Sequence, residues 1–258
     1  MSGATAGHAD GDEPDQPFGP VATRRLLTER LARSFAPQGS RADLARATRT
    51  VIDELLRSMA DDSMFDEAAA LVGRAAALLS EQRHGRGYLG VAEGSLSAPG
   101  PDDAEAGALD RQQHFADYSP FIGGLNPLAP PIAVSFDGDL VIGTCTYGAA
   151  YEGPPGCLHG GFIAAGFDEV LGFAQAFSGK QGMTGQLDIS YRSPTPLFQE
   201  VRFAGRLDSV DGRKIHASAT LHAGDRLCAE AKGLFISMKP EVFSRLLRIR
   251  TDGATASD

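Results

Sequence analysis

The sequence predicts an α+β fold in which an antiparallel sheet wraps around one long apolar helix, with a helical extension before it. Three patterns carry this prediction. Apolar side chains recur at helical spacing over residues 21–82, strand-like alternation begins near residue 130, and an almost continuous apolar run fills 160–177. Sequential antiparallel strands around a single helix form an α+β unit, because each element buries the apolar face of the other.

The bulk composition is that of an ordinary globular protein. Of the 258 residues, 42% are hydrophobic and 22% are charged. The net charge of −9 argues against a general nucleic-acid binder, which would show a basic surface. No apolar run approaches the roughly 18 residues that a membrane helix needs. We therefore expect neither a nucleic-acid partner nor a membrane partner.

The chain is expected to divide into five segments. Residues 1–20 are acidic and have no apolar core, so they are expected to be a disordered tail rather than a secretory signal or a transit peptide. The other four expected segments are a helical extension at 21–82, a linker at 83–116, the α+β domain at 117–240 and a C-terminal tail at 241–258. The stretch GRGYLG within the linker matches GxGxxG formally, but it follows a helical pattern instead of a strand, so we expect no dinucleotide loop there.

The three cysteines, Cys145, Cys157 and Cys228, form no CxxC pair and no metal-like spacing with histidine. No metal site is therefore expected. An odd number of cysteines without a secretory signal fits a reducing cytoplasm, which is the location that we expect. Cys157 stands two residues before His159, as a nucleophile stands near its base, but a small residue packed in a loop is the simpler interpretation.

Six strand-like runs surround the apolar helix, two before it and four after it. Turns with positive φ are expected at Asp137-Gly138, at Asp211-Gly212 and at Gly224-Asp225. The strand after the helix, MTGQLDISYR, alternates apolar and polar residues. Its polar positions are expected to share one face and could line one cleft: Thr184, Gln186, Asp188, Ser190 and Arg192.

The apolar helix carries two adjacent acids, Asp168 and Glu169, in FIAAGFDEVLGFAQAF. An unpaired carboxylate in an apolar site is costly, so such a group is paired, neutral or functional. Neighbouring residues point about 100° apart on a helix, so the two acids cannot share one pocket. The expected core positions of this helix are Phe162, Ile163, Phe167, Val170, Leu171, Phe173 and Phe177.

The glycines of LHGG stand where this helix begins. Backbone N–H groups at a helix start have no partner within the helix, and the helix dipole adds positive potential there. Such a site can stabilise an oxyanion, and a carboxylate two turns further on could act as a nucleophile or general base. The residues alone equally allow a glycine-rich turn before a buried helix, with Asp168 hydrogen-bonded for structure.

Four stretches together resemble one family. They are NPLAPP at 126–131, YEGPPGCLHGGFIAAGFDE at 151–169, MTGQLDISYRSPTPL at 183–197 and DGRKIHASATL at 211–221. The segment 117–240 is similar to the hot-dog-fold acyl-CoA thioesterases of the PaaI type, and especially to their THEM-like branch. The resemblance covers about half of the chain, and it implies the hot-dog fold, in which an antiparallel sheet wraps a central helix.

The resemblance also implies roles for individual residues. Asp168 falls on the catalytic acid, as general base or nucleophile, and Gly160 falls where a backbone N–H polarises the thioester carbonyl, with Gly161 beside it. His159 caps and orients that turn. Thr184 falls on a threonine that assists the water or the carboxylate, typically across a dimer interface.

Ser190, Arg192 and Arg213 fall near positions that contact coenzyme A. The implied reaction is hydrolysis of an acyl-CoA to a free acid and coenzyme A. It needs no cofactor beyond the coenzyme A of the substrate, and the implied assembly is a homodimer or a dimer of dimers. A non-catalytic acyl-CoA binding or sensing protein on the same fold is the alternative. A hydratase fits less well, because hot-dog hydratases usually pair an Asp with a His on a differently spaced motif.

Overall fold

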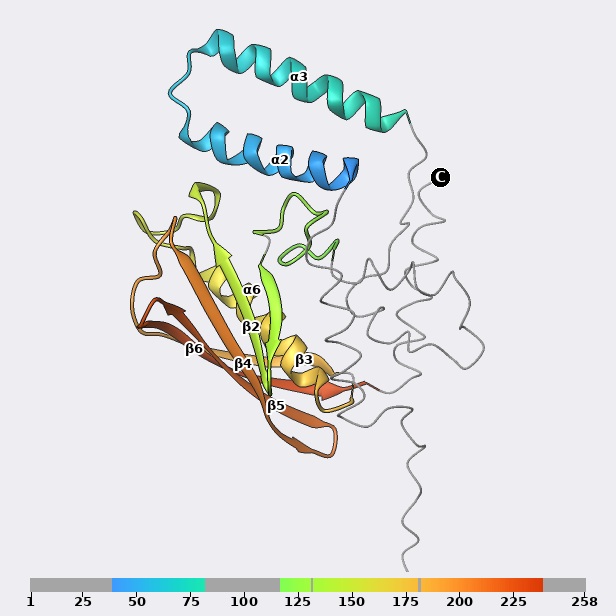
Figure 1. The fold of residues 1–258 in the computed structure, drawn as a ribbon, viewed down its shortest axis with the longest axis vertical. Coiled ribbons are helices and arrows are strands. Elements are labelled where there is room, and N and C mark those ends of the chain that lie inside the picture. Colours follow the sequence, from blue (N-terminus) through green and yellow to red (C-terminus); the bar gives the residue numbers. More distant parts are fainter. Residues whose placement is uncertain (1–38, 82–116, 131, 181, 239–258) are drawn as a thin grey trace, which may run out of the picture.

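A computed structural model describes residues 39–81, 117–130, 132–180 and 182–238 of the chain. A curved antiparallel sheet wraps around one long helix, α6 (Gly160–Ala176), and two further helices lie at one end of this unit (Figure 1). The predicted α+β architecture with a helical extension is therefore confirmed. The predicted tails at 1–20 and 241–258, the predicted linker at 83–116 and residues 21–38 of the predicted extension lie outside the described residues.

The sheet has six strands in the order β1-β2-β4-β5-β6-β3, and all neighbouring pairs are antiparallel. The strands are β1 (Ala133–Asp137), β2 (Leu140–Thr146), β3 (Gly182–Tyr191), β4 (Glu200–Asp211), β5 (Lys214–Ala223) and β6 (Arg226–Ser237). Gly138, Gly212 and Gly224 have φ values of 57°, 53° and 57° at the three hairpin turns. The predicted turns are thus confirmed, because only glycine adopts this left-handed conformation without steric cost.

The core lies between α6 and the inner face of the sheet. Phe167, Val170 and Leu171 are completely buried, and the Phe167 and Phe203 rings meet edge to face at 5.3 Å. Gly166 lets the Phe203 ring approach the helix backbone, since a Cβ at Gly166 would come within 2.5 Å of that ring. The predicted core positions of α6 are buried except Phe162, which is partly buried against the same cluster. This packing fixes which faces of α6 are left for chemistry.

A β-bulge changes the faces of β3. The register between β3 and β6 shifts between Thr184 and Gln186, so Gly185 is an extra residue in the strand. Thr184 therefore points to the same side of the sheet as α6, whereas Gln186 and the polar residues after it point to the opposite side. The expectation that Thr184 shares one polar face with Gln186 is wrong, because strict alternation holds only on either side of the bulge.

The extension contains α2 (Ser40–Arg57) and α3 (Asp62–Ser80), which lie one above the other in Figure 1. Ala42 and Ala45 are the buried residues of α2, and none of the described residues of α3 is buried. None of the helices within the described ranges is both long and apolar enough to span a membrane.

The α2 helix packs on the domain through its small and polar face. The Arg49 guanidinium donates to the carbonyls of Asn126 and Gly124, at 3.0 and 3.2 Å, and Asp53 Oδ1 accepts from the Ala149 N–H at 3.0 Å. Five large apolar side chains of α2 stay exposed, and Leu44, Val51 and Leu55 among them lie on the face opposite the docking face. The other two are Ile52 and Leu56. Hydrogen bonds therefore hold this helix more than apolar burial does.

Candidate active site

The turn that begins α6 is held by hydrogen bonds around its glycines. His159 is the N-cap, and its Nδ1 accepts from the Gly161 N–H at 3.0 Å. The His159 N–H donates to the Tyr151 carbonyl at 2.9 Å. The Gly160 N–H has no acceptor among the described residues, because the first N–H groups of a helix lack an intrahelical partner. At the positive end of the helix dipole, this N–H is a free donor.

Two close contacts keep the same turn compact. A Cβ at Gly153 would come within 2.8 Å of the His159 Cα, so only glycine fits there. From β3, the Tyr191 hydroxyl donates to the Gly160 carbonyl at 3.0 Å. The turn is thus fixed by the loop before α6 and by β3.

Asp168 lies two turns further along α6, on an exposed face of the helix. Thr184 Oγ1 donates to Asp168 Oδ1 at 2.8 Å, and this bond joins α6 to β3 within one chain. The expectation that Thr184 assists Asp168 from a neighbouring subunit is therefore wrong in its placement. One carboxylate oxygen is oriented by the threonine, and the other is left for water or substrate.

Glu169 points to a different side of α6 and has a different environment. It is partly buried, and Glu169 Oε1 accepts from Ser119 Oγ at 2.9 Å. Burial raises the pKa of Glu169 to about 7; the Ser119 hydrogen bond lowers this pKa and the charge of Asp168 raises it. Glu169 is thus a structural acid that joins α6 to the 117–130 segment, whereas Asp168 faces the strand edge.

The Gly160 N–H donor and the Asp168 carboxylate lie far apart within one chain. Gly160 and Asp168 are eight residues apart on α6, which places them about 12 Å apart along the helix axis. A thioester carbonyl within reach of the Asp168 carboxylate cannot also reach the Gly160 N–H of the same chain, since hydrogen bonds span about 3 Å. Each chain therefore presents two half-sites, Gly160 with Tyr191 and Asp168 with Thr184.

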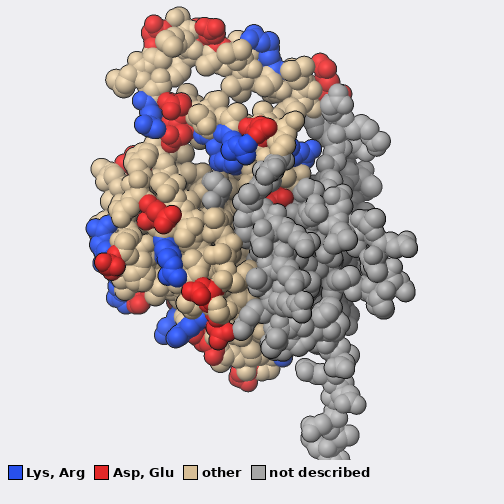
Figure 2. Space-filling view, viewed as in Figure 1, with Lys and Arg blue, Asp and Glu red and all other residues tan. Residues whose placement is uncertain are grey.

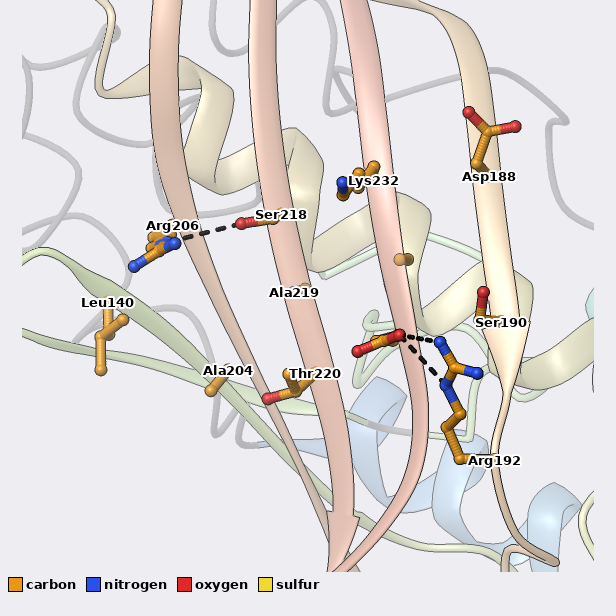
Figure 3. Close-up of a pocket in the computed structure, with 12 residues that line it drawn as sticks. Leu140, Asp188, Ser190, Arg192, Ala204, Arg206, Ser218, Ala219, Thr220 and Lys232 are labelled. Carbon is orange, nitrogen blue, oxygen red and sulfur yellow. Dashed lines mark hydrogen bonds and ion pairs between the residues drawn. The ribbon is translucent and has the colours of Figure 1, made fainter.

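Ser190 and Arg192 lie on the outer face of the sheet. They line an open depression of about 670 Å³. Figure 3 shows both residues at the strands, with the central helix behind the sheet. The Arg192 guanidinium is paired with the Glu230 carboxylate. Lys232 on β6 and Arg206 on β4 line the same depression. The bulge at Gly185 thus separates these residues from the Asp168 face of their own chain.

Arg213 lies at the other end of the sheet. It follows Gly212 in the β4–β5 turn, where its Nε donates to the Ser237 carbonyl at 3.0 Å. The backbone N–H of Arg192 donates to the Cys228 carbonyl. Cys228 precedes Ser237 by nine residues on β6. At about 3.3 Å per residue this separates the two arginines by roughly 30 Å in one chain. One chain cannot use both on the same phosphate group.

The described residues offer few alternatives to this chemistry. They contain no group of three or more His, Cys, Asp or Glu side chains that could hold a metal ion. Cys157 is partly buried and forms an isolated β-bridge with Pro196. The Nδ1 of His159 accepts a hydrogen bond from the Gly161 N–H. Figure 2 shows Lys and Arg interspersed with Asp and Glu over the described part of the visible face.

Sequence reasoning missed two site residues. Tyr191 occupies an apolar position in the alternation of β3, as Leu187 and Ile189 do, so the strand pattern gives no sign of a role for its hydroxyl. Ser119 lies in an irregular segment, and nothing in the local sequence links it to Glu169, fifty residues later. A rule that asks for the partner of every polar atom on a core-facing strand would have singled out Tyr191.

No family model matches the sequence. The chain is 38% identical over 96 residues to the acyl-coenzyme A thioesterase THEM4 of Bos taurus, a match that covers 36% of this chain and 39% of that protein. It is 30% identical over 96 residues to the acyl-coenzyme A thioesterase THEM5 of Homo sapiens, again over 36% of this chain and 39% of the relative. The chain thus spans less than half the length of these curated relatives.

A solved structure extends the likeness over most of the chain. The crystal structure of a thioesterase superfamily protein aligns with a TM-score of 0.66 and 33% sequence identity. The alignment covers 78% of this chain and 96% of that one, so it includes more than the sheet and its central helix. From this similarity and the sheet wrapped around α6, we conclude that the chain belongs to the thioesterase superfamily and has the hot-dog fold.

Proposed function

We propose that this protein is an acyl-CoA thioesterase of the PaaI type, which hydrolyses an acyl-CoA to a free acid and coenzyme A. The observation that carries the proposal is the Thr184–Asp168 hydrogen bond on the exposed face of an otherwise apolar helix. A carboxylate oriented in this way has no packing role, and its free oxygen can serve a reaction. The relatives named acyl-coenzyme A thioesterases support the same substrate class.

We infer that two copies complete each site. β3 is an edge strand of ten residues, and none of them is buried, so it can pair with a second β3. Gly160 lies beside Tyr191 near the end of β3, and Asp168 lies beside Thr184 near its start. Antiparallel pairing of two β3 strands places the end of one beside the start of the other. Each Gly160 N–H then approaches the Asp168 carboxylate of the partner subunit.

The same pairing bears on the coenzyme A contacts. Arg192 lies at the end of β3, and Arg213 lies near its start, so a two-fold pair brings Arg192 of one copy toward Arg213 of the other. Arginines bind phosphates well because the guanidinium offers paired donors. Contacts from Ser190, Arg192 and Arg213 to coenzyme A remain predictions. The Gly161 N–H already donates to His159 Nδ1, so a substrate contact from Gly161 would use other atoms of that residue.

In the proposed reaction, the Gly160 N–H stabilises the oxyanion that forms when the thioester carbonyl is attacked. Asp168 either removes a proton from the attacking water or attacks the carbonyl itself and forms an anhydride, which water then hydrolyses. Collapse of the tetrahedral species breaks the C–S bond. The thiolate of coenzyme A takes up the proton that Asp168 removed from water or, in the nucleophile route, the proton released when water hydrolyses the anhydride. Thr184 holds one Asp168 oxygen in either case. Trapping an acyl-enzyme anhydride would establish the nucleophile role.

Coenzyme A release from a panel of aliphatic and aromatic acyl-CoAs tests the proposal, with the wild type beside Asp168→Asn. We expect turnover by the wild type and a loss of at least ~10²-fold in the variant, because the base or nucleophile is removed. Glu169→Gln is the matched control, since it neutralises the adjacent acid on another face of α6. Tight acyl-CoA binding without turnover by the wild type would favour the binding or sensing protein instead.

A further inference from the structure

Tyr191 is placed to control the geometry of the free donor at Gly160. Its hydroxyl donates to the Gly160 carbonyl at 3.0 Å, although its side chain is on an exposed residue of the edge strand. A Cβ at Gly160 would lie 3.3 Å from the Tyr191 hydroxyl and 3.5 Å from two ring carbons. The ring therefore lies directly against the first residue of α6.

The peptide that follows the donor is held at both of its polar atoms. The Gly160 carbonyl accepts from Tyr191, and the N–H of the same peptide unit, which belongs to Gly161, donates to His159 Nδ1 at 3.0 Å. A peptide plane that is held at its oxygen and at its nitrogen cannot rotate freely. The preceding residue is fixed as well, because the His159 N–H is bonded to the Tyr151 carbonyl. The direction of the Gly160 N–H is therefore set by its surroundings.

We infer that Tyr191 is a positioning residue for the oxyanion donor: its hydroxyl holds the Gly160–Gly161 peptide so that the Gly160 N–H is aimed before substrate arrives. This inference rests on the proposed thioesterase function. A preorganised donor acts on the transition state, where the oxyanion forms, more than on the bound substrate. Loss of the hydroxyl should therefore lower kcat and leave KM nearly unchanged.

The test compares Tyr191→Phe with Tyr118→Phe. Both substitutions remove one hydroxyl and keep the ring, but the Tyr118 hydroxyl accepts from Arg41 in α2, away from the turn. We expect Tyr191→Phe to lower kcat roughly three- to tenfold, as the loss of one neutral hydrogen bond implies, with KM within about twofold of the wild type. Tyr118→Phe should leave both constants unchanged. A Tyr191→Phe variant with unchanged kcat overturns the inference.

A second measurement does not depend on turnover. Amide hydrogen exchange at Gly161, followed by NMR on protein labelled with ¹⁵N-glycine, reports how firmly the peptide is held. We expect exchange at Gly161 to accelerate in Tyr191→Phe and to stay unchanged in Tyr118→Phe. If no acyl-CoA is hydrolysed but the exchange accelerates, the thioesterase proposal fails, whereas the inference that Tyr191 holds the Gly160–Gly161 peptide is supported. If exchange at Gly161 is unchanged in Tyr191→Phe, Tyr191 does not hold this peptide, whatever the activity of the variant.

Discussion

At the scale of single residues, two adjacent acids on α6 have opposite roles because they face different neighbours. Asp168 is exposed and is held by Thr184 from β3, whereas Glu169 is partly buried against Ser119. The desolvated Glu169 has a pKa raised to about 7 and is therefore largely protonated below that pH. The helix tolerates both acids because one reaches the strand edge and the other keeps its proton.

The raised pKa of Glu169 predicts a pH-dependent stability. Between about pH 4.5 and pH 7 the folded state keeps a proton that the unfolded chain has released, so the free energy of unfolding falls as pH rises through this window. Glu169→Gln keeps an oxygen that can accept from Ser119 and removes the titration. We expect the variant to match the wild type near pH 5 and to be more stable near pH 8.

Urea unfolding at the two pH values measures this difference. The two proteins share every other titratable group, so the comparison between wild type and variant isolates Glu169. If the unfolding midpoints of the two proteins keep the same separation at pH 5 and pH 8, Glu169 does not couple stability to pH in this way.

At the scale of elements, the sequence was sufficient wherever local chemistry dictates the geometry. The three hairpin turns follow from glycines that adopt positive φ, and the central helix follows from its apolar run and its glycine start. The face of Thr184 could not be predicted, because the bulge at Gly185 is set by pairing with β6. The Ser119–Glu169 bond could not be predicted either, since it depends on the folded path of a segment without periodicity.

The docking of α2 predicts the effect of a single substitution. Asp53 Oδ1 accepts from the Ala149 N–H, and Gly148 packs so closely that a Cβ there would lie 2.7 Å from that oxygen. Asp53→Ala leaves the Ala149 N–H without this acceptor, which should weaken the docking by about 1–3 kcal/mol. We expect faster hydrogen–deuterium exchange in α2 and unchanged protection in α6.

Asp43→Ala is the control for this substitution. Asp43 is exposed in the first turn of the same helix and pairs with Arg46 of α2 itself. Exposed pairs of this kind contribute little to stability, so the control should leave exchange nearly as in the wild type. Equal exchange in both variants would show that Asp53 does not anchor the extension.

At the scale of the whole molecule, the separation of the two half-sites is the central feature. Residues Gly160 and Asp168 lie about 12 Å apart along the axis of α6, so one chain cannot apply the N–H of the first and the carboxylate of the second to one carbonyl. An isologous pair of chains joined at β3 would contain two equivalent sites, each with the acid from one copy and the donor from the other. Activity should therefore belong to the dimer.

Two inactive variants can test this arrangement. Asp168→Asn removes the acid. Gly160→Pro removes the donor, and proline is tolerated at the first position of a helix. The residue before it, His159, already has the extended ψ of 133° that a following proline requires. Each variant alone should be nearly inactive as a homodimer.

The most direct measurement is the rate of coenzyme A release by a heterodimer of these two variants, isolated through two different affinity tags. One of its two sites combines both defects, and the other combines an intact Asp168 with an intact Gly160. A site shared between two chains should give about half of the wild-type rate per dimer, because one of two equivalent sites is restored. A heterodimer no more active than either homodimer would contradict a site shared between two chains.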